Sequence, residues 1–205
     1  MLHFTVITCD GFNEIDSLLV YHLLNRVKSL DLRVTLCAPM LEVTSMNGLV
    51  VKAQSTLEEA GVADAVIVGS GTRTREFAAT PGFISRIKLN PDRQIIAGQC
   101  SGVLLLERLG LLSDGPVCTD LVTRPWLQQS GVTVLDQPFF AAGNIATAGG
   151  CLASICLASW VIARFKGIEA ALEPLASIAP FGEKEGLIAN VRRNISPYLC
   201  RESPS

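Results

Sequence analysis

The most constraining feature of this sequence is the stretch Gly98–Gly102, which reads GQCSG. It follows a short apolar run, Ile95–Ala97, and precedes a second apolar run at helical spacing, Val103–Leu112. A strand that turns into a helix within a few residues forces one residue into a strained conformation, and the turn closes only if the residues two before and two after it are small. Glycines occupy both positions. The pattern predicts a nucleophile elbow, with Cys100 in the place that α/β-hydrolases give to serine.

Such a turn would lift the Cys100 sulfur above the carboxyl edge of a sheet. At the positive end of the following helix a thiolate is favoured over a thiol. The backbone N–H of Ser101 would then be free to bind an anion that forms beside the sulfur. We therefore interpret Cys100 as a reactive thiol. The alternative that a five-residue pattern leaves open is a buried structural cysteine in an ordinary strand-to-helix turn.

Length and composition favour one α/β domain that covers residues 1–205. Charged residues make up 18% of the chain and apolar residues 49%, so most elements should be covered on both sides, as in a parallel sheet between helix layers. The 17 Lys and Arg against 19 Asp and Glu give a net charge of −2 without a basic cluster, which argues against nucleic-acid binding. The most apolar segment, Cys151–Phe165, is shorter than the roughly 20 residues of a membrane span and predicts a core helix, so we expect no membrane partner.

The seven cysteines, at positions 9, 37, 100, 118, 151, 156 and 200, are odd in number and lack metal-ligand spacing. Cys151 and Cys156 are five residues apart, which does not fit a CxxC redox or zinc site. The start of the chain leads directly into a strand-like run, without a signal peptide. We therefore expect a reducing, cytoplasmic location, no metal and no cofactor.

Asp16 is the one acid on the apolar stripe of the first predicted helix, which begins near Glu14 after the strand Phe4–Thr8. A carboxylate on such a stripe loses water and must be compensated or protonated. The residue lies just past the carboxyl end of a strand, where open α/β sheets place their sites. Asp16 is therefore a candidate site residue, and the alternative is that it only caps the helix.

Further elements follow along the chain. Strands are predicted at Leu32–Ala38 and Ala65–Val68, with weaker candidates at 117–120, 132–135 and 139–140. Residues 42–44 and 49–51, joined through Asn47 and Gly48, predict a β-hairpin with a type I′ turn. Residues 55–59 carry a capping-box signal.

The strand Ala65–Val68 ends in Gly69, Ser70 and Gly71, a glycine-rich turn that exposes backbone N–H groups toward the carboxyl edge. It matches neither a Walker pattern nor a GxGxxG run, so a phosphate site has little support. The alternative is that the turn supplies a second N–H donor facing Cys100.

These pieces together resemble the DJ-1/PfpI superfamily, which is related to class I glutamine amidotransferases. The resemblance rests on Asp16, on the strand end Val68–Gly71 where the family usually has Pro-Gly-Gly, on the elbow Gly98–Gly102, and on the glycine-rich Gly143–Gly150. It implies a flavodoxin-like three-layer sandwich with a mostly parallel sheet, helices on both faces and a small hairpin excursion. It also implies a homodimer with the site near the interface.

The resemblance further implies that Asp16 touches the Cys100 sulfur and that Gly71 and Ser101 supply N–H donors. Many members carry a histidine after the elbow helix, in a Thr-His segment. Arg124 stands in that place here, and we expect it to shape the substrate pocket together with Ser70 and Trp126. The chain's two histidines, His3 and His22, match no catalytic position of the family.

The missing histidine disfavours peptidase, amidotransferase and glyoxalase chemistry, which commonly asks an imidazole to move the thiol proton. The arrangement resembles the isonitrile hydratase branch. There a thiolate adds to an electrophilic carbon, the acid delivers a proton, and water releases an N-substituted formamide. We expect a hydratase or lyase that acts on a small-molecule substrate through Cys100 and a protonated Asp16. The alternatives are a redox or stress-response protein that senses oxidants through Cys100, and a non-catalytic metabolite-sensing module.

Overall fold

The computed structural model describes residues 1–28, 31–112 and 115–199. Within them, seven strands form one sheet in the order β5-β2-β1-β6-β7-β9-β8, and every neighbouring pair is parallel except β8 and β9. The strands are β1 (Leu2–Ile7), β2 (Leu32–Ala38), β5 (Ser55–Thr56), β6 (Ala65–Val68), β7 (Ile95–Gln99), β8 (Phe139–Ala142) and β9 (Ile145–Ala148). The predicted mostly parallel sheet is confirmed.

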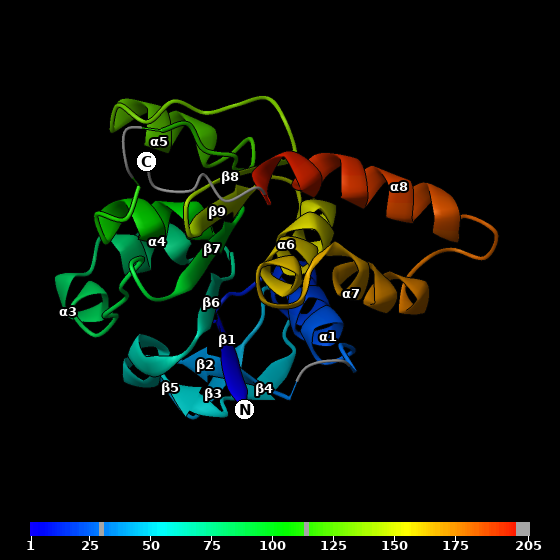
Figure 1. The fold of residues 1–205 in the computed structure, drawn as a ribbon. Coiled ribbons are helices and arrows are strands. Elements are labelled where there is room, and N and C mark those ends of the chain that lie inside the picture. Colours follow the sequence, from blue (N-terminus) through cyan, green and yellow to red (C-terminus); the bar gives the residue numbers. More distant parts are fainter. Residues whose placement is uncertain (29–30, 113–114, 200–205) are drawn as a thin grey trace.

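Helices cover both faces of this sheet (Figure 1). One layer contains η1 (Ile15–Leu19), α1 (Val20–Leu24), α6 (Ser154–Lys166), α7 (Ile168–Leu172), η4 (Glu173–Ser177) and α8 (Lys184–Ile195). The opposite layer contains α2 (Thr74–Ala78), α3 (Pro81–Ile84), α4 (Gly102–Arg108) and α5 (Arg124–Gln129). The result is the expected flavodoxin-like sandwich of three layers.

The buried strands supply apolar side chains to both layers of helices. Successive residues of a strand point to opposite faces, so a strand that is apolar throughout feeds two cores. In β6, Ile67 packs into the cluster with α1, α6 and α8, whereas Val66 and Val68 pack into the cluster with α3 and α4. In β7, Ala97 packs into the first of these clusters and Ile96 into the second.

α6 is the core helix that the apolar segment predicts. Ten of its thirteen residues are buried, and the Trp160 side chain is fully enclosed. Neither α6 nor any other helix in the described part of the chain combines the length and the apolar character that crossing a bilayer requires.

The hairpin excursion consists of β3 (Glu42–Thr44) and β4 (Val50–Lys52), but its turn differs from the prediction. A type I′ turn needs positive φ at both central residues. Gly48 has φ 91°, whereas Asn47 is not among the described residues with positive φ. The connection is instead a longer loop in which the Ser45 hydroxyl oxygen accepts the N–H groups of Asn47 at 3.2 Å and of Leu49 at 2.9 Å.

Two predicted strands are absent from the described structure. Residues 117–120 and 132–135 meet only in one isolated bridge between Val117 and Val134. Both valines are buried in the α4-side cluster, so packing rather than sheet pairing explains their apolar pattern.

The capping-box prediction is confirmed. The Glu59 carboxylate accepts the Thr56 N–H at 2.7 Å, and the Thr56 hydroxyl accepts the Glu59 N–H at 3.4 Å, at the start of η2 (Glu58–Val62).

Candidate active site

The turn between β7 and α4 has the strained geometry that its glycines indicate. Cys100 has φ 49° and is the one non-glycine residue with positive φ in the described ranges. A Cβ atom on Gly102 would lie 2.6 Å from the backbone oxygen of Gly69, and one on Gly98 would lie 2.8 Å from Cδ1 of Leu106. Any side chain at these two positions would collide with a neighbour, which explains why both are glycine.

The Cys100 side chain is buried, with 4% of its surface exposed. Its sulfur lies in a cluster with Asp16 and Cys151, in which the sulfur atoms and a carboxylate oxygen all lie within 4.8 Å of one another. The structure therefore brings together the predicted pair Cys100 and Asp16. It adds Cys151, which precedes α6 in the short helix η3 (Cys151–Ala153) and which sequence spacing did not single out.

Asp16 is fully buried and does not cap its helix. The Asn13 side-chain oxygen does so, by accepting the N–H groups of Ile15 at 3.0 Å and of Asp16 at 3.4 Å. The Ser70 hydroxyl donates a hydrogen bond to Oδ2 of Asp16. Oδ1 has no hydrogen-bond partner within the described ranges. A buried carboxylate oxygen without a partner is costly for stability, which points to a role in the site rather than in the fold.

Burial, followed by the negative charge of Asp16, raises the pKa of the Cys100 thiol above its ordinary value. The hydrogen bond from Gln99 acts in the opposite direction and is weaker. The elbow pattern predicts a thiolate, but burial and the charge of Asp16 favour the protonated sulfur. Two anions in contact repel, so the negative charge of Asp16 opposes ionisation of the sulfur.

The two predicted N–H donors differ in availability. The Gly71 N–H donates to the Ser101 hydroxyl oxygen at 3.2 Å and is occupied. That hydroxyl in turn lies 3.0 Å from the hydroxyl oxygen of Thr74. The Ser101 N–H has no acceptor in the described part of the chain. Of the two predicted donors, the Ser101 N–H is therefore the unoccupied one, and the Gly71 N–H holds the Ser101 side chain.

Arg124 and Trp126 occupy different places. Arg124 lines an open groove of about 620 Å³, together with Thr119 and Gly150. The groove adjoins the elbow, because the Thr119 hydroxyl donates to the Cys100 carbonyl at 2.8 Å and the Gly150 carbonyl accepts from the Gln99 amide at 3.0 Å.

The ring of Trp126 faces the Arg75 guanidinium, 4.5 Å from the ring centre, and lines a separate hollow. The structure thus places Arg124 beside the site and Trp126 outside it.

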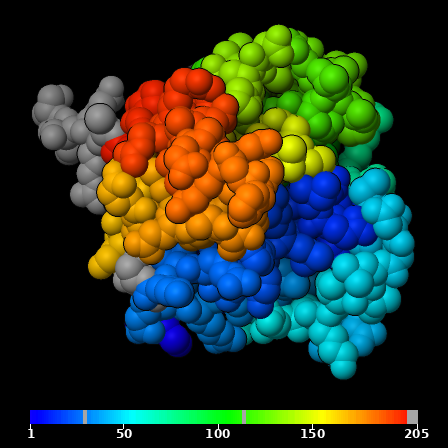
Figure 2. All heavy atoms as spheres, turned by 90° about the vertical axis from the view of Figure 1, so that its right-hand side faces the viewer, coloured from blue at the N-terminus to red at the C-terminus, as the bar shows by residue number. Residues whose placement is uncertain are grey.

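Both histidines are engaged elsewhere. His3 lies in β1, where its Nε2 is 2.9 Å from the hydroxyl oxygen of Thr35. His22 lies in α1, where its Nε2 is 3.1 Å from the hydroxyl oxygen of Ser177. Figure 2 shows one face of the molecule, where the N-terminal segment in blue lies beside the C-terminal helices in orange and red. The Cys100 site therefore contains no imidazole.

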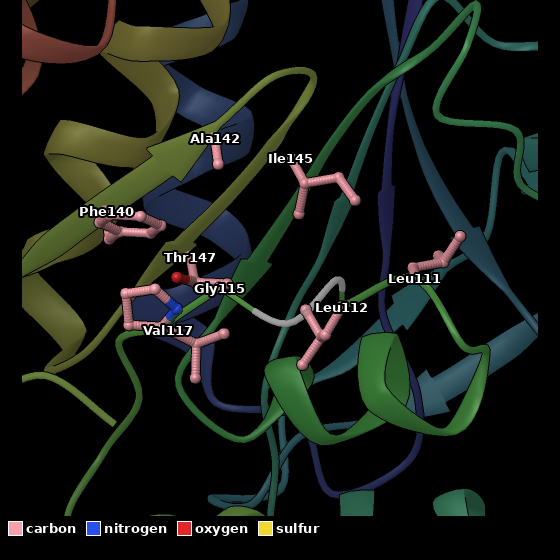
Figure 3. A pocket seen from close by; sticks show the side chains of 9 residues that line it. Leu111, Leu112, Gly115, Val117, Phe140, Ala142, Ile145 and Thr147 are labelled. Atoms are coloured by element: carbon pink, nitrogen blue, oxygen red, sulfur yellow. The ribbon is translucent and has the colours of Figure 1, made fainter. Parts of the chain in front are cut away.

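A further hollow lies between residues 111–112 and 115–117 on one side and the antiparallel pair β8 and β9 on the other (Figure 3). Its walls are mostly apolar, with Leu112, Val117, Phe140 and Ile145 among them, and its volume is about 30 Å³. This is room for little more than a water molecule. None of the predicted site residues lines it, so it does not belong to the site.

Comparison with known proteins agrees with this architecture. Residues 3–164 match the model of the DJ-1/PfpI family. A cysteine on a strained strand-to-helix turn, with a buried acid beside it in a flavodoxin-like sandwich, defines the class of protein, and the chain belongs to the DJ-1/PfpI family. The family resemblance found in the sequence is confirmed. A comparison with curated proteins finds no match.

Several solved structures share the fold. A ThiJ/PfpI family protein from Pseudomonas syringae aligns with a TM-score of 0.77 at 18% identity, covering 95% of this chain and 88% of its own. A cysteine-to-alanine mutant of a DJ-1 superfamily protein from Salmonella typhimurium gives 0.71 at 23% identity, covering 87% and 98%. DJ-1beta from Drosophila melanogaster gives 0.72 at 17% identity, covering 86% and 97%. At these identities the likeness concerns the fold alone.

Proposed function

We propose that this protein is a cysteine-dependent hydratase that adds water to a small electrophilic carbon, in the manner of isonitrile hydratases. The observation that carries the proposal is the contact between Cys100 and Asp16, a buried pair with one unpartnered carboxylate oxygen. The Cys100 sulfur and a carboxylate oxygen of Asp16 lie within 4.8 Å of each other, so a small approach of the two side chains would let them exchange a proton. Chemistry of this kind needs a nucleophile and an acid, and it does not need an imidazole.

The first half of the reaction forms a bond to sulfur. As the substrate R–N≡C enters, the Cys100 proton passes to Asp16, and the sulfur bonds to the terminal carbon. Asp16 then delivers its proton to that carbon, which gives a thioimidate. The Ser101 N–H, which follows Cys100 in the elbow and has no acceptor in the described part of the chain, would stabilise the negative charge that develops on the sulfur. Ser70 holds the carboxyl group in place through its hydrogen bond to Oδ2.

The second half releases the product. Water adds to the thioimidate carbon, and its second proton reaches the nitrogen by way of Asp16. The carbon–sulfur bond then breaks, giving R–NH–CHO and returning one proton to the pair of Cys100 and Asp16. The net reaction consumes one isonitrile and one water. The groove beside Gly150 and Arg124 offers an approach for a small uncharged substrate.

The test is turnover of a small alkyl isonitrile, followed by appearance of the formamide. We expect turnover by the wild type, a loss beyond detection in Cys100→Ser, and a fall of about 10²-fold or more in Asp16→Asn, because the proton carrier is removed. Cys156→Ser is the matched control. Its sulfur lies in α6, where Asn194 donates to it at 3.7 Å, and its rate should equal that of the wild type.

Equal rates for the wild type and Cys100→Ser would remove Cys100 from the mechanism. Tight binding of the isonitrile without turnover would instead support a metabolite-sensing module. A folded Asp16→Asn variant with the full rate would show that the acid has no part in the reaction.

We also propose that the protein is a cytoplasmic homodimer. The six described cysteines are free thiols, as a reducing compartment requires. Leu121 and Val122 line the groove and Leu152 follows Cys151 in η3; all three expose apolar side chains that a partner subunit would cover. Sedimentation equilibrium at micromolar concentration tests the dimer, and a monomer mass would refute it.

A further inference from the structure

Cys151 has a place in the molecule that the proposed hydratase chemistry does not use. It follows Gly149 and Gly150 at the carboxyl end of β9, and it is only partly buried. Its sulfur lies within 4.8 Å of both the Cys100 sulfur and a carboxylate oxygen of Asp16. The Asn13 side-chain amide donates to the Cys151 sulfur at 3.4 Å. Two free thiols and a carboxylate thus share one small volume.

We propose that Cys151 is a resolving cysteine, and that a hydroperoxide converts Cys100 and Cys151 into a reversible intramolecular disulfide. This inference does not depend on the proposed hydratase activity. It concerns a modification of the site that needs only the two sulfurs and the acid beside them.

The geometry permits the bond after a small movement. A disulfide has an S–S length of about 2.05 Å, so sulfurs that start within 4.8 Å of one another approach by less than about 3 Å. Cys100 is fixed by the elbow, so Cys151 makes the movement. It follows Gly150, which has φ 85° and open space where a Cβ would lie. Rotation of the Cys151 side chain and a slight shift of this loop bring the atoms together.

The first step oxidises Cys100. Its proton passes to Asp16, and the sulfur attacks one oxygen of the hydroperoxide ROOH. The O–O bond breaks, and the alkoxide takes the proton from Asp16 to leave as ROH. The sulfur loses two electrons and becomes a sulfenic acid, and the peroxide gains them.

The second step forms the disulfide and needs no further oxidant. Asp16 accepts the Cys151 proton, and the Cys151 sulfur attacks the Cys100 sulfur. The S–O bond breaks, and the leaving hydroxide takes the proton from Asp16 to form water. The Asn13 amide stabilises the negative charge on the attacking sulfur. Asp16 is well placed to carry both protons, because its Oδ1 has no competing partner in the described part of the chain.

Without Cys151 the sulfenic acid would have a different fate. A second hydroperoxide would convert it into a sulfinic acid, which thiols do not reduce. Cys151 therefore makes oxidation of this site reversible. While the disulfide is present the nucleophile is blocked, and reduction by a thiol restores it.

The experiment treats the full chain briefly with a small excess of hydrogen peroxide in the presence of a chelator, followed by denaturation, alkylation of the remaining thiols and mass analysis. For the wild type we expect the loss of two hydrogens, a peptide pair that links Cys100 to Cys151, and full reversal by dithiothreitol. Cys151→Ser should instead gain oxygen atoms at Cys100 and resist dithiothreitol. Cys156→Ser should behave as the wild type, since its sulfur lies away from the cluster.

Peptide mapping of the oxidised wild type tests the proposal without relying on any variant. A wild-type Cys100 that gains two oxygens, with no link to Cys151, would overturn it. So would a disulfide that pairs Cys100 with another cysteine. Isonitrile turnover plays no part in these readouts, so a protein without hydratase activity could still form the disulfide, and the two proposals fail separately.

Discussion

The Gln99 side-chain amide donates a hydrogen bond to the sulfur of Cys100 at 3.2 Å, and the same nitrogen donates to the Gly150 carbonyl at 3.0 Å. Gln99 thereby ties the elbow to the loop that carries Cys151. A donor to sulfur stabilises the thiolate, and this hydrogen bond lowers the pKa of Cys100 against the larger effects of burial and Asp16.

Removing that donor should make Cys100 less reactive. We expect Gln99→Leu, which keeps most of the side-chain volume, to raise the pKa of Cys100 and to slow its alkylation by iodoacetamide about three- to tenfold near neutral pH. Gln129→Leu, an exposed position in α5, is the control and should leave the rate unchanged. An unchanged rate in Gln99→Leu would show that the bond does not govern the sulfur.

Substitution of Asp16 should change the alkylation rate of Cys100 and the rate of isonitrile turnover in opposite directions. The negative charge of Asp16 raises the pKa of Cys100, so Asp16→Asn should lower that pKa and increase the fraction of thiolate at a given pH. Alkylation of Cys100 should therefore become faster while isonitrile turnover becomes slower. Both rates, measured on the same preparation, give the test. A parallel fall in the two would indicate a collapsed site rather than a lost acid.

The glycines of the elbow should be intolerant of any side chain. A Cβ on Gly102 would meet backbone oxygen atoms that cannot move aside, so Gly102→Ala should lower the free energy of unfolding by more than about 2 kcal/mol. Gly186 lies in α8 with open space around it, and Gly186→Ala should raise stability by about 0.5–1 kcal/mol. Urea unfolding of the two variants provides the comparison, and equal effects would contradict the steric explanation.

Alkaline pH should destabilise the protein through its buried thiols. Burial raises the pKa of Cys37 from 9.0 to about 12. The unfolded chain loses this proton near 9.0 and the folded chain near 12, so the contribution is complete below about pH 9 and is lost as pH rises toward 12. The urea midpoint should fall between pH of about 8 and about 10.5.

Cys37→Ala serves as the control for this dependence. The cavity that this substitution leaves lowers the urea midpoint at every pH. The further decrease of the midpoint at alkaline pH should be smaller than in the wild type. A variant with the same alkaline decrease would show that other groups cause it.

Much of the fold and part of the site could be predicted from the sequence, because the steric and hydrophobic requirements behind them act between residues close together in the chain. The spacing of Gly98 and Gly102 around Cys100 is a steric requirement within five residues, and it predicted the elbow. The apolar strands 65–68 and 95–97 predicted a sheet that is buried on both faces. Asp16 could be chosen because an acid on an apolar stripe needs an explanation wherever it occurs.

Tertiary structure decided the rest, because those properties depend on which distant segments meet. It placed Cys151 beside Cys100, although the two are far apart in the sequence and fit no spacing rule. It occupied the Gly71 N–H with the Ser101 hydroxyl and turned Trp126 toward Arg75. Local dipoles favour a thiolate at the elbow, but burial and the adjacent carboxylate raise the pKa of Cys100, because solvent exclusion and charge proximity arise only when the chain is packed.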